Sequence, residues 1–215
     1  MTQLKTPASP RLPDPGPAGV NAGYMVGFIN VLRLYINQIS NLFQLLFGPL
    51  GGVYVENPHA MLMSNQDQTN PSITGANTVS YNQSVISQGV EVRSSNQIWF
   101  ESAGQYLVTA RLQVANRGAA AAEFEVWLGS SGSNYALSNT RFDIPARKSI
   151  SVWSHIVPTI PFIFTVTNPQ TQYLTVQWWA GSTDVVLEHY AAGTSPTRPE
   201  IPSVIMTVNF VSRLP

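Results

Sequence analysis

Cysteine is absent from this chain of 215 residues, and charged residues are scarce. Without thiols the chain can form no disulfide, and it offers neither a thiolate nucleophile nor a cysteine-based metal site. Eleven basic and eleven acidic side chains give a formal net charge of zero, so no general attraction to nucleic acid is expected. Only 10% of the residues are charged, against about 25% in an average soluble chain. We therefore expect other subunits to cover part of the surface.

Sequence motifs of catalysis and metal binding are missing as well. The three histidines include no pair four residues apart and no His-Glu-x-x-His. Glu188 and His189 are neighbours in an expected strand, where adjacent side chains point to opposite faces, so they are not expected to share a site. The glycine motifs of nucleophile elbows and phosphate loops are absent. The sequence predicts a protein that is not an enzyme and that holds neither a cofactor nor a metal.

The first segment, "MTQLKTPASPRLPDPGPAGV", is rich in proline. Proline fixes φ and lacks the amide N–H, so residues 1–20 are expected to form an extended arm and not a helix or a central strand. The segment contains no apolar stretch of the kind that a secretion signal needs, which predicts synthesis in a cytoplasm.

The next segment, residues 21–52, is apolar but interrupted: "NAGYMVGFINVLRLYINQISNLFQLLFGPLGG". Apolar residues recur with alternating spacings of three and four, which predicts an amphipathic helix with a heptad stripe. The stripe comprises Met25, Phe28, Leu32, Tyr35, Ile39, Leu42 and Leu46. Ile29, Ile36 and Phe43 repeat every seven residues beside it and widen it. Glycine and proline after residue 47 end the expected helix.

Three uses of this helix are open from the sequence: a membrane span, packing on the β domain of its own chain, or the seam of an oligomer. Polar residues, including Arg33, occupy the remaining face, which argues against membrane insertion. A heptad stripe of this width favours a self-associating bundle, and a trimer over a dimer. We expect a homotrimer.

From residue 53 to 215 the apolar pattern changes to period two. In "QYLVTARLQV" the residues Tyr106, Val108, Ala110 and Leu112 fall on one face. "FEVWL", "YLTVQWW" and "VIMTVNF" alternate in the same way, and turn-forming clusters such as "GSSGSN" lie between several such segments. This pattern predicts a mainly β domain of about ten short antiparallel strands, arranged as a jelly-roll sandwich.

The middle of this β region resembles a known superfamily. "QIWFESAGQYLVTARLQV" reads as a strand, an F-x-x-x-G-x-Y corner and a long alternating strand, and "SVIMTVNFVS" closes the domain. These segments resemble the jelly roll of the tumour-necrosis-factor and complement globular-head superfamily, over roughly residues 60–212. The resemblance implies that the G-x-Y strand and the last strand line both the core and a threefold contact.

The whole arrangement is similar to structural proteins of tailed bacteriophages. A proline-rich start, the helix, a jelly roll and the ending "PSVIMTVNFVS" carry this second resemblance. It implies a homotrimeric capsid decoration, cement or head-fibre protein of the virion, assembled in the cytoplasm of a bacterial host. Its partner would be the major capsid protein or a tail or portal adaptor. The arm residues expected to anchor it are Pro7, Pro10, Arg11, Pro13, Pro15 and Pro17.

A different function class stays open because of the aromatic residues. Rings on a protein surface can stack on sugars, and aromatics are also enriched in protein interfaces. The alternation places Trp178 and Trp179 on opposite faces of one strand, so one is expected in the core and the other at the surface. The candidate surface aromatics are Trp127, Trp153, Trp179 and Tyr190. The alternative function is a tail-fibre or spike module that binds host surface glycans.

Overall fold

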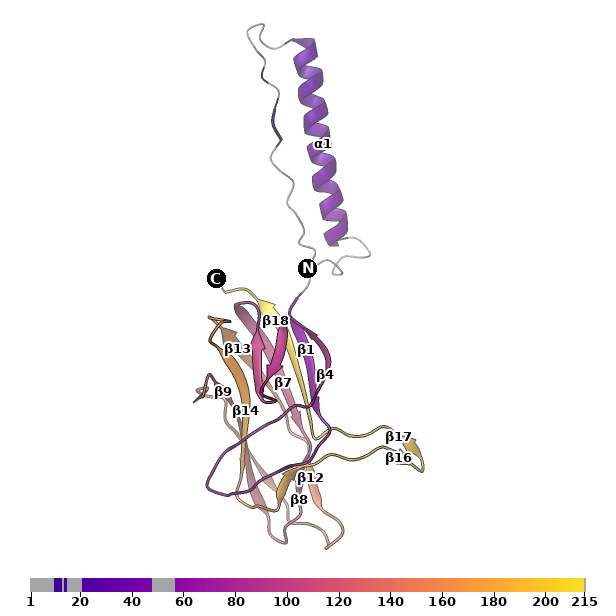
Figure 1. Ribbon diagram of the computed structural model, residues 1–215. Coiled ribbons are helices and arrows are strands. Elements are labelled where there is room, and N and C mark those ends of the chain that lie inside the picture. Colours follow the sequence, from indigo (N-terminus) through magenta and orange to yellow (C-terminus); the bar gives the residue numbers. More distant parts are fainter. Residues whose placement is uncertain (1–9, 13, 15–20, 48–56, 215) are drawn as a thin grey trace. The chain divides into compact units, whose positions relative to one another are not determined.

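The computed structural model describes residues 10–12, 14, 21–47 and 57–214. The chain divides into two compact units, Met1–Glu56 and Asn57–Pro215. The first contains the helix α1 (Ala22–Phe47), and the second contains the strands (Figure 1). With 49% of the residues in strands and 12% in helix, the mainly β class expected from the alternating pattern is confirmed.

Helix α1 begins at a polar cap. The side-chain Oδ1 of Asn21 accepts the backbone N–H of Tyr24 at 2.9 Å, and the Asn21 carbonyl oxygen accepts that of Met25 at 3.0 Å. An asparagine in this position satisfies amide groups that have no partner inside the first helical turn. Within the described residues, no helix combines the length and the hydropathy that a membrane crossing requires.

One sheet of the second unit has five strands, all paired antiparallel to their neighbours. In sheet order these are β13 (Thr159–Val166), β7 (Gly104–Leu112), β18 (Val204–Ser212), β1 (His59–Ser64) and β4 (Gln83–Gln88). The expected G-x-Y strand and the last strand of the chain are therefore hydrogen-bonded neighbours, as β7 and β18.

A second antiparallel sheet has seven strands. Its main path is β10 (Ser133–Asn134), β9 (Ala122–Ser130), β14 (Tyr173–Ala180), β6 (Gln97–Phe100) and β5 (Val90–Arg93). In addition, β11 (Thr140–Ile144) pairs with β9, and β3 (Asn77–Thr78) pairs with β14.

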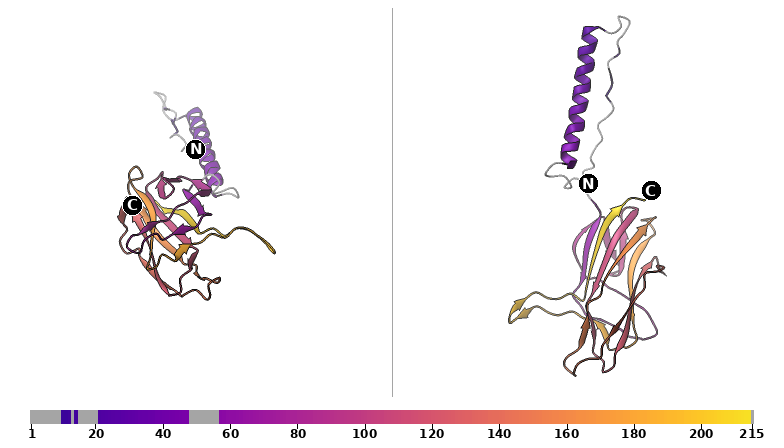
Figure 2. Two further views of the ribbon diagram at one scale, coloured as in Figure 1. Left: turned by 60° about the horizontal axis from the view of Figure 1, so that its bottom comes forward. Right: turned by 180° about the vertical axis from the view of Figure 1, so that it is seen from behind.

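Two smaller sheets complete the unit. One comprises β12 (Ser154–Ile156), β8 (Val114–Asn116), β15 (Val185–Leu187) and β2 (Gln68–Thr69). The other is a hairpin of β16 (Gly193–Thr194) and β17 (Thr197–Arg198), which projects from the body of the second unit (Figure 2).

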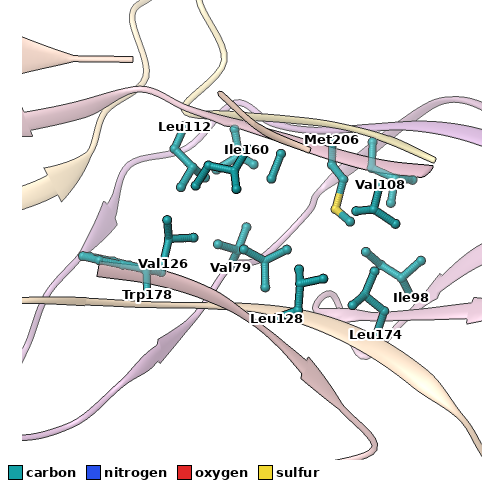
Figure 3. Close-up of a cluster of buried hydrophobic side chains, with 14 of the residues drawn as sticks. Val79, Ile98, Val108, Leu112, Val126, Leu128, Ile160, Leu174, Trp178 and Met206 are labelled. Carbon is teal, nitrogen blue, oxygen red and sulfur yellow. The ribbon is translucent and has the colours of Figure 1, made fainter. Parts of the chain in front are cut away.

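The two large sheets share one hydrophobic core. Side chains from the five-stranded sheet, such as Leu112, Val108 and Met206, point toward Val126 and Trp178 of the seven-stranded sheet (Figure 3). The alternation predicted for β7 is confirmed, because its residues are buried and exposed in turn along the strand. Burial of these alternate side chains, at roughly 25 cal/mol per Å² of apolar area, is the main favourable contribution to folding.

The corner before β7 shows why a glycine stands at the third-last position of the F-x-x-x-G-x-Y sequence. A Cβ on Gly104 would collide with the ring of Phe210 and would lie 2.7 Å from the carbonyl oxygen of Ser212. The hydroxyl of Tyr106 donates to the carbonyl of Ser102 at 2.8 Å, and its ring meets Phe210 edge-on at 5.3 Å. The motif therefore fixes the close packing between the start of β7 and the end of β18.

Candidate functional site

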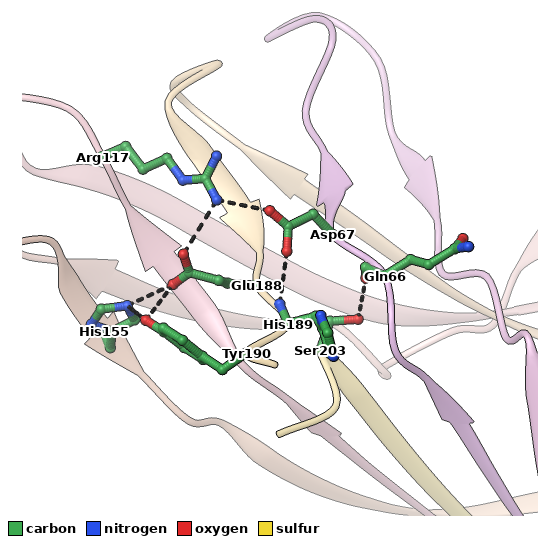
Figure 4. A network of polar contacts seen from close by, with 8 residues as sticks. All are labelled: Gln66, Asp67, Arg117, His155, Glu188, His189, Tyr190 and Ser203. Atoms are coloured by element: carbon green, nitrogen blue, oxygen red, sulfur yellow. Dashed lines mark hydrogen bonds and ion pairs between the residues drawn. The ribbon is translucent and has the colours of Figure 1, made fainter. Parts of the chain in front are cut away.

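A buried carboxylate, that of Glu188, follows strand β15 and joins several polar side chains of the second unit. Its side chain is only 4% exposed. Oε1 accepts Nη2 of Arg117 at 3.2 Å, and Oε2 accepts the hydroxyl of Tyr190 at 2.6 Å and contacts Nε2 of His155 at 2.8 Å (Figure 4). Both carboxylate oxygens are thus engaged, as a buried carboxylate requires.

Arg117 links the buried carboxylate of Glu188 to the more exposed carboxylate of Asp67. Arg117 also bonds Oδ2 of Asp67 at 2.9 Å, and Oδ1 of Asp67 accepts the backbone N–H of His189 at 2.8 Å. The guanidinium of Arg117 lies 4.3 Å from the ring centre of Trp153, as a cation–π contact. The network therefore joins loops and strand ends that are far apart in the sequence. We call it the Glu188 network; it comprises Asp67, Arg117, His155, Glu188 and Tyr190.

The tyrosine of the network is held in its neutral form. Burial raises the pKa of Tyr190, and the hydrogen bond to Glu188 and the negative charge of that carboxylate raise it further. Burial likewise raises the pKa of Tyr81, and burial together with the negative charge of Glu101 raises the pKa of Tyr106 to about 12. In each case the folded state disfavours the tyrosinate.

These tyrosines predict that the protein loses stability in alkaline solution. Below the ordinary tyrosine pKa of about 10, all three are neutral in both states and their full contribution is present. As pH rises above that value, the unfolded chain ionises first, so folding free energy is lost with increasing pH. Urea unfolding at a series of pH values, with tyrosinate absorbance recorded in parallel, should show this decline. Stability that stays constant well above pH ~10 would contradict the burial of these side chains.

The outer faces of the two large sheets differ in chemistry. The outer face of the five-stranded sheet carries few charges: in register across β13, β7, β18 and β1 lie Pro161, Thr109, Thr207 and Met61. In the three central strands, Arg111 is the only Lys, Arg, Asp or Glu among the outward positions. We call this surface the β7–β18 face.

On the seven-stranded sheet, the outward residues include ion-paired charges and aromatic rings. Arg141 on β11 pairs with Glu123 on β9 and lies 3.8 Å from Asp143, and Arg93 pairs with Glu91. Among the predicted surface aromatics, Trp127 lies on this face on β9 and Trp179 on β14, both partly exposed. Trp178 is buried in the core, which confirms the split expected for this pair.

The other two candidate aromatics belong to the Glu188 network or touch it. Trp153 covers Arg117, and Tyr190 donates to Glu188. Glu188 and His189 point to different partners, as their adjacency predicted: His189 Nε2 lies 3.3 Å from Oε2 of Glu200. No local pattern predicts the pairing of Glu188 with His155, because 33 residues separate them.

The heptad stripe lies on α1 with several of its apolar side chains exposed. Met25 and Leu32 are exposed at 43% and 38%. Phe28, Tyr35, Ile39 and Leu42 are partly buried, and the side chain of Leu46 lies outside the described residues. Of the expected anchoring residues, Pro10 and Arg11 are described, whereas Pro7, Pro13, Pro15 and Pro17 lie outside the described residues.

Among the described residues, no three His, Asp or Glu side chains form a group that could hold a metal ion. No family model matches the chain, and no curated protein matches its sequence.

Proposed function

We propose that this protein is a non-enzymatic structural component of a phage virion, a homotrimer of the capsid-decoration, cement or head-fibre type. The observation that carries the proposal is the β7–β18 face, a sheet surface with few charges and several exposed apolar side chains, on a chain whose other large sheet carries ion pairs on its outer face. A surface of this kind is typical of contact with another subunit. The occupant proposed here is the same face of two further copies.

The outward side chains of this face support that choice. Leu107 and Ile163 lie opposite one another on β7 and β13 and are 36% and 49% exposed. Ile86 on β4, opposite Met61, is 52% exposed. Uncharged side chains make up most of this face, and in its three central strands only Arg111 would need a partner of opposite charge when the face packs against a copy of itself.

Strand order supports the jelly-roll assignment within this proposal. Between β6 and β18 the chain passes repeatedly from one large sheet to the other, and each return places a strand beside one that is distant in sequence. Such alternation between two sheets is typical of jelly rolls. The central position of β7 and β18 agrees with the threefold contact that the superfamily resemblance implies.

Helix α1 supplies the second self-contact in the proposal. Its heptad stripe would pack against the same stripe of two other chains, and the proline-rich arm would dock on the major capsid protein or on an adaptor. Proline restricts the free arm, so less conformational entropy is lost when it binds. Three arms on one trimer would bind together and gain affinity by avidity.

Light scattering on the full-length protein tests the trimer, with three times the chain mass expected. Thr207→Glu on the β7–β18 face and Leu32→Glu on the helix stripe should each weaken it, because an unpaired carboxylate in a contact costs several kcal/mol. Two variants serve as matched controls. Gln177→Glu places the same charge on the outer face of the other sheet, and Leu34→Glu places it off the heptad stripe.

Each outcome bears on a different part of the proposal. Trimers in wild type and controls, with loss of trimer in Thr207→Glu or Leu32→Glu, support it. A monomeric wild type, or a trimer that both variants retain, overturns the self-contact. Co-sedimentation with purified capsids and with tails then tests location: binding to capsids that depends on residues 1–20 supports a decoration role, and binding to neither particle contradicts it.

A further inference from the structure

The outer face of the seven-stranded sheet contains a hollow of about 610 Å³ next to the β9–β10 hairpin. Its walls combine one indole ring, one carboxylate and two primary amides with apolar side chains; those used below are Trp127, Glu125, Asn134, Asn139 and Leu137. Concave sites with apolar walls and a few convergent polar groups are typical of small-ligand binding. We propose that this hollow binds a neutral oligosaccharide, with a pyranose ring stacked on Trp127.

The indole of Trp127 is oriented for stacking. Its Nε1–H donates to Oδ1 of Asn134 at 2.9 Å, across the hairpin that joins β9 to β10. The ring is partly exposed, and the hydrogen bond fixes its orientation before any ligand arrives. A ring held in this way offers a flat apolar face at little cost in conformational entropy, which suits the C–H groups of a sugar ring.

Polar groups at the rim match sugar hydroxyls. Nδ2 of Asn139 donates to Oε2 of Glu125 at 2.8 Å, which orients a carboxylate whose oxygens can accept hydrogen bonds from sugar hydroxyls. Because Oδ1 of Asn134 accepts the indole N–H, the amide NH₂ of Asn134 is the part that can donate. Acceptors and donors around one aromatic ring are what hydroxyl recognition needs.

Charge selects a neutral ligand over an acidic one. None of the residues that line the hollow is a cation, and the carboxylate of Glu125 would repel an acidic sugar. On the adjacent strand, Arg141 lies opposite Glu125, but its guanidinium is already paired with Glu123 and lies 3.8 Å from Asp143. A phosphorylated or sulfated ligand would therefore have to compete with these carboxylates for a counter-charge.

Leu137 combines two unfavourable features, an exposed apolar side chain and a strained backbone, which contact with a ligand would explain. It is fully exposed, and its φ is +60°, in the left-handed region that a leucine rarely occupies. Backbone strain of this kind concentrates at binding sites, where the surrounding structure holds it in place. A leucine that is both exposed and strained at the rim points to an apolar contact with the sugar.

The neighbouring strand extends the surface beyond one sugar ring. In the register of β9 and β14, Gln177 lies opposite Trp127 and Trp179 lies opposite Glu125. The two indoles are therefore diagonal neighbours on one sheet face, separated by polar side chains. Such a pair can contact successive sugars of a chain, so an oligosaccharide is favoured over a monosaccharide.

Titration of the full-length protein with neutral oligosaccharides, followed by tryptophan fluorescence and calorimetry, tests the proposal. Malto-, cello- and chito-oligosaccharides serve as neutral probes, and a sialylated oligosaccharide as the acidic one. At least one neutral probe should bind, and Trp127→Ala should weaken it about tenfold or more, a loss of ~1.4 kcal/mol. Trp99→Ala removes an indole from the same sheet face outside the hollow and should leave binding unchanged.

Leu137→Gly separates binding from folding. Glycine relieves the left-handed strain, so the melting temperature should rise or stay the same while the affinity for the neutral probe falls. Absence of binding to any neutral probe, preference for the acidic probe, or equal losses in Trp127→Ala and Trp99→Ala would each overturn the site. These results are independent of the trimer, because the hollow and the β7–β18 face lie on different sheets.

Discussion

Replacing Phe124 with alanine is expected to lower the free energy of unfolding by about 3–5 kcal/mol. The ring is fully buried between the two large sheets, and its centre lies 5.9 Å from that of Trp178. Truncation removes contacts across the core and leaves a cavity that close-packed neighbours fill only in part. Urea unfolding followed by circular dichroism measures the loss, at one protein concentration because association also stabilises folded chains.

An exposed apolar residue provides the comparison for this core variant. Ile150 is 82% exposed, so Ile150→Ala should change the unfolding free energy by no more than about 0.5 kcal/mol. If Phe124→Ala and Ile150→Ala lower the free energy of unfolding by the same small amount, the ring of Phe124 does not lie in a packed core. The inward orientation assigned to Phe124 would then be wrong.

Removal of the Glu188 carboxylate should also lower the free energy of unfolding strongly. Glu188→Ala is expected to cost about 2–4 kcal/mol, because Arg117, His155 and Tyr190 all lose a hydrogen-bond partner. The value is below that of a fully buried ion pair, since the side chains of Arg117 and His155 are 31% and 30% exposed and water can replace part of the interaction. The same urea measurement applies.

Two further variants separate charge from shape. Glu188→Gln keeps an acceptor oxygen for Tyr190 but lacks the charge that Arg117 faces, so its loss should fall between wild type and Glu188→Ala. The double variant with Arg117→Ala should lose less than the sum of the two single losses, by about 0.5–3 kcal/mol, as expected for residues in one network. Strict additivity would mean that the two side chains do not interact in solution.

The helix and the faces of the long strands could be predicted from the sequence because they depend on the spacing of residues that are close together in the chain. The helix follows from the spacing of apolar residues between 25 and 46, and the glycine and proline residues after position 47 predict its end through their φ preference. The cap at Asn21 was found only in the structure. Strand faces follow from a period of two, so β7 and β9 and the separation of Trp178 from Trp179 could be derived without coordinates.

Residues that are brought together across the fold were not readable in this way. Tyr190 and Trp153 were expected to be surface aromatics, since the sequence does not show the carboxylate or the guanidinium that lies beside each ring in the fold. Asn134 and Asn139 gave no signal as partners of Trp127 and Glu125, because amides in turn-rich stretches are common and mostly solvated.

The helix with its heptad stripe, the alternation of each long strand and the scarcity of charge could therefore be derived from the sequence alone. Which strands pair, that the outer face of one large sheet carries few charges while the other carries ion pairs and aromatic rings, and that Glu188 contacts Arg117, His155 and Tyr190 depend on the three-dimensional fold. The physical reason is one of range. Period and propensity act over a few residues, whereas strand order and register depend on packing between segments that are tens to more than a hundred residues apart.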